Sequence, residues 1–222
     1  SIEGKKAGSI GHAGCFSFYP TKTITTSEGG MLVTSDPELY RKAKSYRDRG
    51  IDLDADREQY VRIGTNNRMT EIAALMGRSQ LRSLDGFLER RRQVAAAYDE
   101  QLAASDISAC FAPVRVPANV THACWRYIVS LDPRIDRTEL RGMMFHDDIP
   151  IDWAYDPPLH LQPVFVSMYG MDRGMLPRSE DLLDHSICLP MHACLDLDDA
   201  RFIVQRLIAH VRTLLERDSR SP

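Results

Sequence analysis

Two short apolar runs enclose a polar, threonine-rich segment near the start of the chain. Residues 14–18 and 30–34 each have the length and composition of a buried β-strand. The polar segment between them holds one lysine, Lys22, which therefore lies among strands and hydroxyl groups rather than on a charged helix face. Two strands that flank a polar turn often present side chains at a site. Taken alone, however, Lys22 would be more typical of an ordinary surface lysine.

Helical signals follow this segment. Asp36 before Pro37 predicts the N-cap and first position of a basic helix that ends at Gly50. Between residues 70 and 102, apolar side chains recur at helical steps, which predicts one long helix interrupted only at Gly86.

Three consecutive arginines, Arg90, Arg91 and Arg92, lie on the polar face of this predicted long helix. They could form a phosphate clamp, but a solvated helix face is the more ordinary interpretation.

The second half of the chain alternates strands and helices. Strands are predicted at 125–131, 149–153 and 187–189, and a proline-rich loop at 155–169. Asp136 and Glu139 have the spacing of a capping box for a helix to Phe145. A last helix from about residue 196 is predicted to bury the following residues: Phe202, Ile203, Leu207, Val211 and Leu214.

Composition and charge exclude several classes of protein. The 28 basic and 31 acidic residues are interspersed and give a net charge of −3, so there is no basic stripe for nucleic acid. No apolar run approaches the roughly 18 residues of a membrane span, and no signal-peptide pattern opens the sequence, so we expect a soluble, cytoplasmic protein. The five cysteines include no C-x-x-C pair, which favours buried free thiols over disulfides or a metal site.

The segment from Phe16 to Gly30 (FSFYPTKTITTSEGG) closely resembles the Schiff-base lysine segment of the DegT-type sugar aminotransferases, which are fold-type I pyridoxal-phosphate enzymes. Ser17 matches the serine that binds the cofactor phosphate in that family, and Lys22 matches its Schiff-base lysine. A hydroxyl donor on the phosphate and an amine at the aldehyde carbon would hold opposite ends of one rigid ring.

A second resemblance lies in residues 64–71 (GTNNRMTE), which are similar to the family's Gly-Tyr-Asn-Tyr-Arg-Met segment before a long helix. Asn66 then matches the asparagine that reaches the cofactor phosphate of the neighbouring subunit, which implies a homodimer with shared active sites. Thr65 and Asn67 depart from the usual tyrosines. Without the resemblance, Asn66 would be interpreted as a turn residue at a helix entry.

Residues 156–163 resemble the family's Pro-Leu-His segment, and residues 186–192 its C-terminal Leu-Pro-x-His segment. Tyr155 and His160 are candidates to line a sugar-nucleotide pocket, or alternatively packed loop residues, whereas His192 is expected to be structural. The resemblance implies an α/β, fold-type I aminotransferase fold. Residues 1–112 would be the end of the large cofactor domain with its connecting helix, and residues 113–222 a small α+β domain.

The family carries an acidic residue that protonates the pyridine nitrogen of the cofactor, and an aromatic that stacks on it, ahead of the region matched here. The opening SIEGKKAGS resembles the segment directly after that acidic residue. We therefore expect the sequence to represent the latter half of a family member, because either the sequence or the gene is incomplete, and we expect this half alone to be inactive.

The function that the resemblance implies is transfer of an amino group from glutamate or glutamine to a keto sugar, expected to be nucleotide-linked, in amino-sugar biosynthesis. The family's dehydratases replace the lysine by histidine, so Lys22 favours transamination. A catalytically inactive partner or regulatory protein on the same scaffold is the alternative. A dinucleotide-binding oxidoreductase is excluded, because the glycines at 8, 11 and 14 lack the G-x-G-x-x-G spacing and form, we predict, a turn into the first strand.

Overall fold

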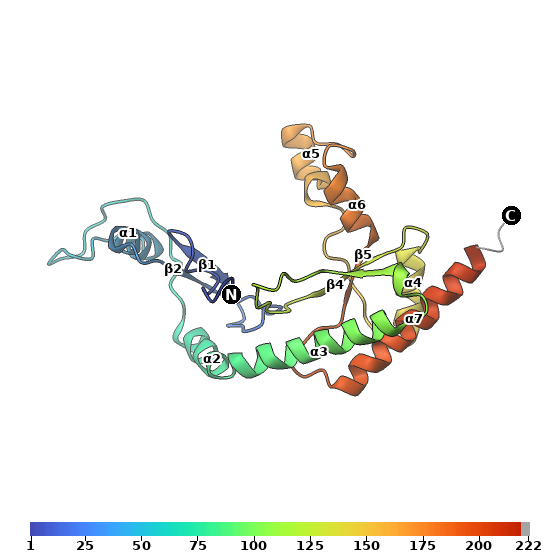
Figure 1. Ribbon diagram of the computed structural model, residues 1–222. Helices are drawn as coiled ribbons and strands as arrows, with labels where there is room; N and C mark the ends of the chain where they lie inside the picture. Colours follow the sequence, from blue (N-terminus) through green and yellow to red (C-terminus); the bar gives the residue numbers. More distant parts are fainter. Residues whose placement is uncertain (219–222) are drawn as a thin grey trace. The chain divides into compact units, whose positions relative to one another are not determined.

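The computed structural model describes residues 1–218, which form two compact units (Figure 1). Unit 1 comprises residues 1–88 and 116–122, and unit 2 comprises residues 89–115 and 123–218. The domain boundary predicted after residue 112 stays a prediction. In the part of the chain that is described, no helix is long and apolar enough to cross a membrane.

Unit 1 begins with a turn at residues 7–12 and a two-stranded antiparallel sheet. Strands β1 (Gly14–Ser17) and β2 (Gly30–Val33) pair in a register that sets Gly14 opposite Val33 and Ser17 opposite Gly30. The two predicted strands and the predicted turn are therefore confirmed. A Cβ atom on Gly14 would lie 2.3 Å from the carbonyl oxygen of Gly8, so glycine is required where the turn crosses the strand.

Helix α1 (Pro37–Arg47) confirms the predicted basic helix. The Asp36 carboxylate accepts the N–H groups of Glu38 and Leu39, which caps the first turn. The helix ends at Arg47, before the predicted Gly50, and Gly50 adopts a left-handed φ of 83° just beyond it.

The long helix predicted over 70–102 is two helices, α2 (Glu71–Arg82) and α3 (Leu84–Ala104), and the predicted interruption was wrong. The break lies at Ser83, while Gly86 is inside α3. Serine favours helix ends because its hydroxyl competes for backbone hydrogen bonds, whereas a single glycine in a helix costs only about 1 kcal/mol. Thr70 caps α2 by accepting the N–H of Ala73 at 3.2 Å.

The two units differ in what they bury. The cluster of buried hydrophobic side chains belongs entirely to unit 2. In unit 1, large apolar side chains on β1, β2, α1 and α2 are exposed, and on α2 Ile72 and Leu75 are 74% and 65% exposed.

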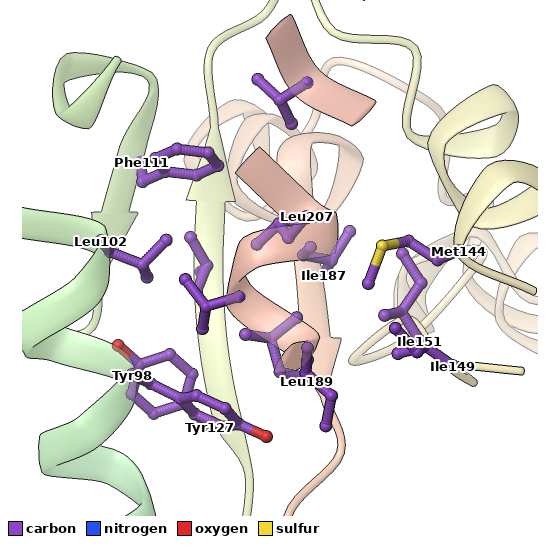
Figure 2. Close-up of a cluster of buried hydrophobic side chains, with 14 of the residues drawn as sticks. Tyr98, Leu102, Phe111, Tyr127, Met144, Ile149, Ile151, Ile187, Leu189 and Leu207 are labelled. Atoms are coloured by element: carbon purple, nitrogen blue, oxygen red, sulfur yellow. The ribbon is translucent and has the colours of Figure 1, made fainter. Parts of the chain in front are cut away.

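Unit 2 is built on a three-stranded antiparallel sheet of order β3-β4-β5 (Phe111–Pro113, Tyr127–Leu131, Ser186–Leu189). A short 3-10 turn, η1 (Ser108–Cys110), precedes β3. Helices α3, α4 (Arg137–His146) and α7 (Leu197–Asp218) supply most of the rest of the core, and loop residues such as Ile149 and Leu195 complete it. Figure 2 shows side chains of α3, β5 and α7, among them Tyr98, Ile187 and Leu207, converging in this core.

Local predictions in unit 2 met mixed outcomes. Asp136 caps α4 as predicted, accepting two backbone N–H groups. The strand predicted at 149–153 is absent from the described chain, which forms one bridge between Asp152 and Cys188, because Pro150 has no N–H to extend a ladder. On α7 the predicted aliphatic residues are buried, but Phe202 is half exposed, so its predicted burial was wrong.

The loop predicted at 155–169 contains helical structure, and a further helix follows it. These elements are η2 (Leu159–Leu161), α5 (Pro163–Tyr169) and α6 (Pro177–His185). Pro163 lies in the predicted loop but begins α5, and Pro177, beyond that loop, begins α6 in the same way, because proline suits the first helical position. Figure 1 shows α5 beyond α6, whose C-terminal end runs directly into β5.

Three of the five cysteines, Cys110, Cys124 and Cys188, are buried free thiols as predicted. Cys15 and Cys194 are also free, but they are exposed, so the expected burial was wrong for these two.

Candidate active site

The segment that carries Lys22 is a closed turn between β1 and β2. Phe18 donates its N–H to the carbonyl of Gly29 at 2.9 Å, and its own carbonyl accepts the N–H of Thr26 at 3.0 Å. Within the turn, the backbone N–H of Lys22 bonds to the carbonyl of Tyr19 at 2.9 Å. Lys22 is half-buried, so its side chain projects from a backbone whose shape is set on both sides.

The threonines explain how this turn holds its shape. The hydroxyl of Thr25 donates to the carbonyl of Phe18 and accepts the N–H of Ser27, both at 2.9 Å. The buried Thr26 donates to the carbonyl of Glu28 at 2.8 Å. Gly29 has φ of 154°, and a Cβ atom there would lie 2.4 Å from the Thr26 hydroxyl oxygen, so only glycine fits.

Helix α2 fixes the same turn from outside it. The side-chain oxygen of Gln80 accepts the backbone N–H of Thr25 at 2.8 Å, across 55 residues of sequence. One helical turn earlier, Gly77 packs so closely on Thr26 that a Cβ atom would lie 2.8 Å from its methyl group. Residues 77 and 80 share one helix face, so this face of α2 is a template for the Lys22 turn, meaning that its contacts fix the conformation of the turn.

Ser17 ends β1 and is exposed. Its hydroxyl oxygen accepts the N–H of Tyr19 at 3.4 Å, which leaves the hydroxyl hydrogen to donate to a ligand.

Asn66 lies in a segment whose backbone is held by the end of α1. The N–H of Arg49 bonds to the carbonyl of Thr65, and the N–H of Asn67 bonds to the carbonyl of Arg47, both at 2.9 Å. The Asn66 side chain is exposed, and its carbonyl oxygen accepts a hydrogen bond from Nε of Arg68 at 3.0 Å.

The Lys22 turn and the segment after Asn66 meet at a cavity of about 670 Å³ within unit 1. Its lining comes from residues 26–30, residues 67–70 and Ala73. Ser17, Lys22 and Asn66 are not among the described residues that line this cavity, so the structure brings together the segments that follow Lys22 and Asn66 rather than the three side chains themselves.

Tyr155 belongs to unit 2 and is 62% exposed. Its ring centroid lies 6.0 Å from the guanidinium of Arg126. Nη1 of Arg126 also donates to the carbonyls of Trp153 at 3.1 Å and Ala154 at 3.3 Å, so this arginine holds the loop that carries Tyr155.

His160 is buried, with 7% exposed, and its Nε2 lies 3.0 Å from the carboxylate of Glu180. That carboxylate also accepts the N–H groups of Gly174, at 2.8 and 2.9 Å, and Leu176, at 3.0 Å. These bonds, that of Gly174 foremost, lower the pKa of Glu180. The pair ties η2 to α6, and the same carboxylate also holds the loop before that helix.

The predicted solvated face of arginines was wrong for Arg91. Arg91 is buried, and its Nη1 donates to the carbonyls of Cys124, Trp125 and Met191 at 3.0–3.2 Å. Burial lowers the pKa of this guanidinium. The residue links α3 to the start of β4, which is a structural task that its helical position did not reveal.

Among the described residues, no group of three or more His, Cys, Asp or Glu side chains is arranged to hold a metal ion.

Comparison with known proteins gives a consistent result. The family model described as the DegT/DnrJ/EryC1/StrS aminotransferase family matches residues 1–208. A GDP-perosamine synthase from Escherichia coli O157:H7 is 31% identical over 207 residues, which cover 92% of this chain and 53% of that protein. A pleiotropic regulatory protein from Geobacillus stearothermophilus is 30% identical, with 94% of this chain and 54% of that protein covered.

Among solved structures, the aminotransferase TlmJ from Streptoalloteichus hindustanus matches with a TM-score of 0.85 and 29% identity. The match covers 96% of this chain and 56% of that one. The chain therefore spans about half the length of the relatives it matches.

Proposed function

The chain belongs to the DegT/DnrJ/EryC1/StrS aminotransferase family, and from this premise we propose that it contributes the lysine-bearing half of a sugar aminotransferase that uses pyridoxal phosphate. The predicted fold class, α/β of fold type I, is confirmed by the similarity to solved sugar aminotransferases. The observation that carries the proposal is the braced turn between β1 and β2, which holds Lys22 five residues after Ser17.

The side chains present fit the cofactor that this family uses. Ser17 has a hydroxyl hydrogen left to donate, and the Asn66 amide has its oxygen engaged by Arg68. Both are therefore poised as donors, which suits a phosphate. Lys22 supplies the amine for the aldehyde carbon.

Pyridoxal phosphate, when bound, supplies the electron sink for transamination. Lys22 Nζ would hold this cofactor. As general base and acid, the same amine would accept and return the proton at the substrate carbon. Ser17 and Asn66 bind and orient the phosphate.

The active site is proposed to be shared in a homodimer, with Asn66 directed at the phosphate site of the neighbouring subunit. The substrate is proposed to be a keto sugar linked to a nucleotide, with glutamate or glutamine as the amino donor. The name of the GDP-perosamine synthase relative supports a nucleotide-linked sugar. Tyr155, exposed beside Arg126, is proposed to contact this substrate, whereas the buried His160 is proposed to shape the pocket through its pair with Glu180.

The chain by itself is proposed to be inactive. The resemblance implies that the carboxylate for the pyridinium nitrogen lies in the part of the relatives that this chain does not match. Purified alone with cofactor, glutamate and a panel of keto-sugar nucleotides, it should give no turnover. A rate of about 1 per second or faster would contradict this expectation.

The alternative, a regulatory protein on an aminotransferase scaffold, is favoured by one observation, the similarity to the pleiotropic regulatory protein. The two proposals differ in whether Lys22 holds a cofactor.

Reduction of the full-length, cofactor-loaded protein with borohydride, followed by peptide mapping, tests the proposal. The reduced cofactor should be found on Lys22 and should be lost in Lys22→Ala but retained in Lys44→Ala, which alters an exposed lysine of α1. Recovery of the cofactor on another lysine (Lys5, Lys6, Lys42 or Lys44) would contradict the assignment. Absence of any trapped cofactor would favour the regulatory alternative.

A further inference from the structure

The side chain of Asn66 has two possible orientations that differ in chemistry. Rotation of its terminal amide exchanges a hydrogen-bond acceptor, the carbonyl oxygen, with a double donor, the NH2 group. A phosphate accepts hydrogen bonds, so only the orientation that presents the NH2 group binds it. The torsion that separates the two orientations is soft and roughly two-fold.

Arg68 selects between these orientations in the structure. Its Nε donates to Oδ1 of Asn66 at 3.0 Å, and a guanidinium has donors only. The contact is therefore satisfied only when the carbonyl oxygen faces Arg68, which leaves the NH2 group for a ligand. The reverse orientation would set two donor groups against each other.

Arg68 is itself held in place. Its Nε lies 3.6 Å from Oδ1 of Asp48, the same oxygen that accepts a hydrogen bond from Arg49 at 3.1 Å. Asp48 is the C-cap of α1, and its backbone forms a bridge with that of Asn66. Both the backbone and the side chain of Asn66 are therefore held in place from the end of α1.

We propose that Arg68 is a positioning residue for cofactor binding, which acts by holding the Asn66 amide in its donor orientation toward the phosphate. The proposal rests on the proposed phosphate role of Asn66. Arg68 acts through Asn66 and does not itself bind the cofactor, so its effect depends on the presence of the amide.

The test is a double-mutant cycle on the full-length protein, with the dissociation constant of pyridoxal phosphate measured by equilibrium dialysis. Asn66→Ala removes a hydrogen bond to a charged group and should weaken binding by about 10- to 100-fold. Arg68→Met should weaken binding by roughly 2- to 10-fold, the range of one ordinary hydrogen bond. In the Asn66→Ala background, Arg68→Met should change the dissociation constant by less than about 1.5-fold, because contacting residues are not additive when one acts through the other.

Controls separate orientation from charge and from folding. Arg41→Met removes an exposed arginine of α1 and should leave the dissociation constant unchanged. Binding of pyridoxal, which lacks the phosphate, should be insensitive to Arg68→Met. If that variant fails to fold, Asp48→Asn, which loosens Arg68 without removing it, should weaken phosphate-dependent binding in the same direction.

Each outcome has one meaning. If Arg68→Met weakens binding equally with and without Asn66, the guanidinium acts directly on the phosphate and the positioning role is overturned. If Asn66→Ala weakens binding while both Arg68→Met and Asp48→Asn leave it unchanged, the inference fails and the proposed function stands. If Asn66→Ala has no effect, the proposed role of Asn66 fails as well.

Discussion

Gln80 of α2 offers a direct way to perturb the Lys22 turn without touching any residue proposed to meet the cofactor. Its side-chain oxygen accepts the backbone N–H of Thr25 at 2.8 Å in a half-buried position. Gln80→Ala removes the acceptor, and the freed N–H can reach water in part, so the cost is that of an ordinary neutral hydrogen bond, about 0.5–1.5 kcal/mol. If the turn must re-form that geometry to bind the cofactor, this cost appears as about 2- to 12-fold weaker binding.

Gly77→Ala tests whether the packing of α2 on Thr26 also fixes the Lys22 turn. The new Cβ atom would lie 2.8 Å from the methyl group of Thr26, whose hydroxyl is fixed to Glu28 at 2.8 Å and cannot turn away without losing that bond. Alanine gains about 1 kcal/mol of helix propensity over glycine, while overpacking costs about 1–3 kcal/mol. The steric cost should win, so cofactor binding should weaken although α2 itself is strengthened.

The assay is the dissociation constant of pyridoxal phosphate for the full-length protein, together with the yield of borohydride trapping on Lys22. Gln80→Glu keeps a side-chain oxygen acceptor and should retain most of the affinity, and Ser79→Ala on the exposed face of α2 should be neutral. Wild-type affinity in both Gln80→Ala and Gly77→Ala would refute the idea that α2 is a template for the turn. So would an equal loss in Ser79→Ala.

Three further predictions concern the dimer and unit 2. Equal mixing of Lys22→Ala and Asn66→Ala subunits, assayed at a cofactor concentration too low to load the Asn66→Ala parent, should restore about a quarter of wild-type activity. About half the dimers are then mixed, and each of these has one intact site; mixed dimers without any gain would contradict the shared site. Tyr98→Phe removes the hydroxyl that donates to the carbonyl of Pro190 at 2.7 Å. It should lower the free energy of unfolding, measured by urea titration, by about 1–2 kcal/mol. An unchanged midpoint of urea unfolding would contradict this and show that water replaces the bond. The pKa of Glu180 is lowered in the folded protein. Its stabilising contribution is therefore present above the unfolded pKa of about 4.3 and is lost as the pH falls through the lower folded pKa. Glu180→Gln should flatten this acid dependence of the thermal unfolding temperature, and an identical pH profile in the variant would contradict the prediction.

The sequence predicted best those features that neighbouring residues decide. Asp36 and Asp136 cap their helices as predicted, because an N-cap depends on the next three residues alone. The break at Ser83 and the helix that begins at Pro163 were missed, since serine and proline are compatible with both loops and helix starts. Phe202 was expected inside because of its type, although a single exposed apolar residue is normal.

The site was predictable in a different sense. Ser17, Lys22 and Asn66 stood out because their segments resemble a known family, and the structure gives physical reasons for the residues around them. The threonines close the turn by local bonds that the sequence could have suggested. Gln80 and Gly77 could not be assigned, because their contacts cross more than fifty residues and no local pattern marks them.

A hydrophobic core usually fixes the geometry of a domain and also provides its stability. In unit 1 these two roles are separate. Its buried side chains among the described residues are Thr26 and Ser45, and each donates its hydroxyl to a backbone carbonyl. Such bonds fix direction but contribute only about 1 kcal/mol each, whereas burial of one large aliphatic side chain contributes about 1.5–3 kcal/mol. Ile72 and Leu75 are available for that burial on α2, the helix that braces the Lys22 turn. It follows that any contact which buries these side chains would stabilise α2 and, through Gln80 and Gly77, the turn that holds Lys22.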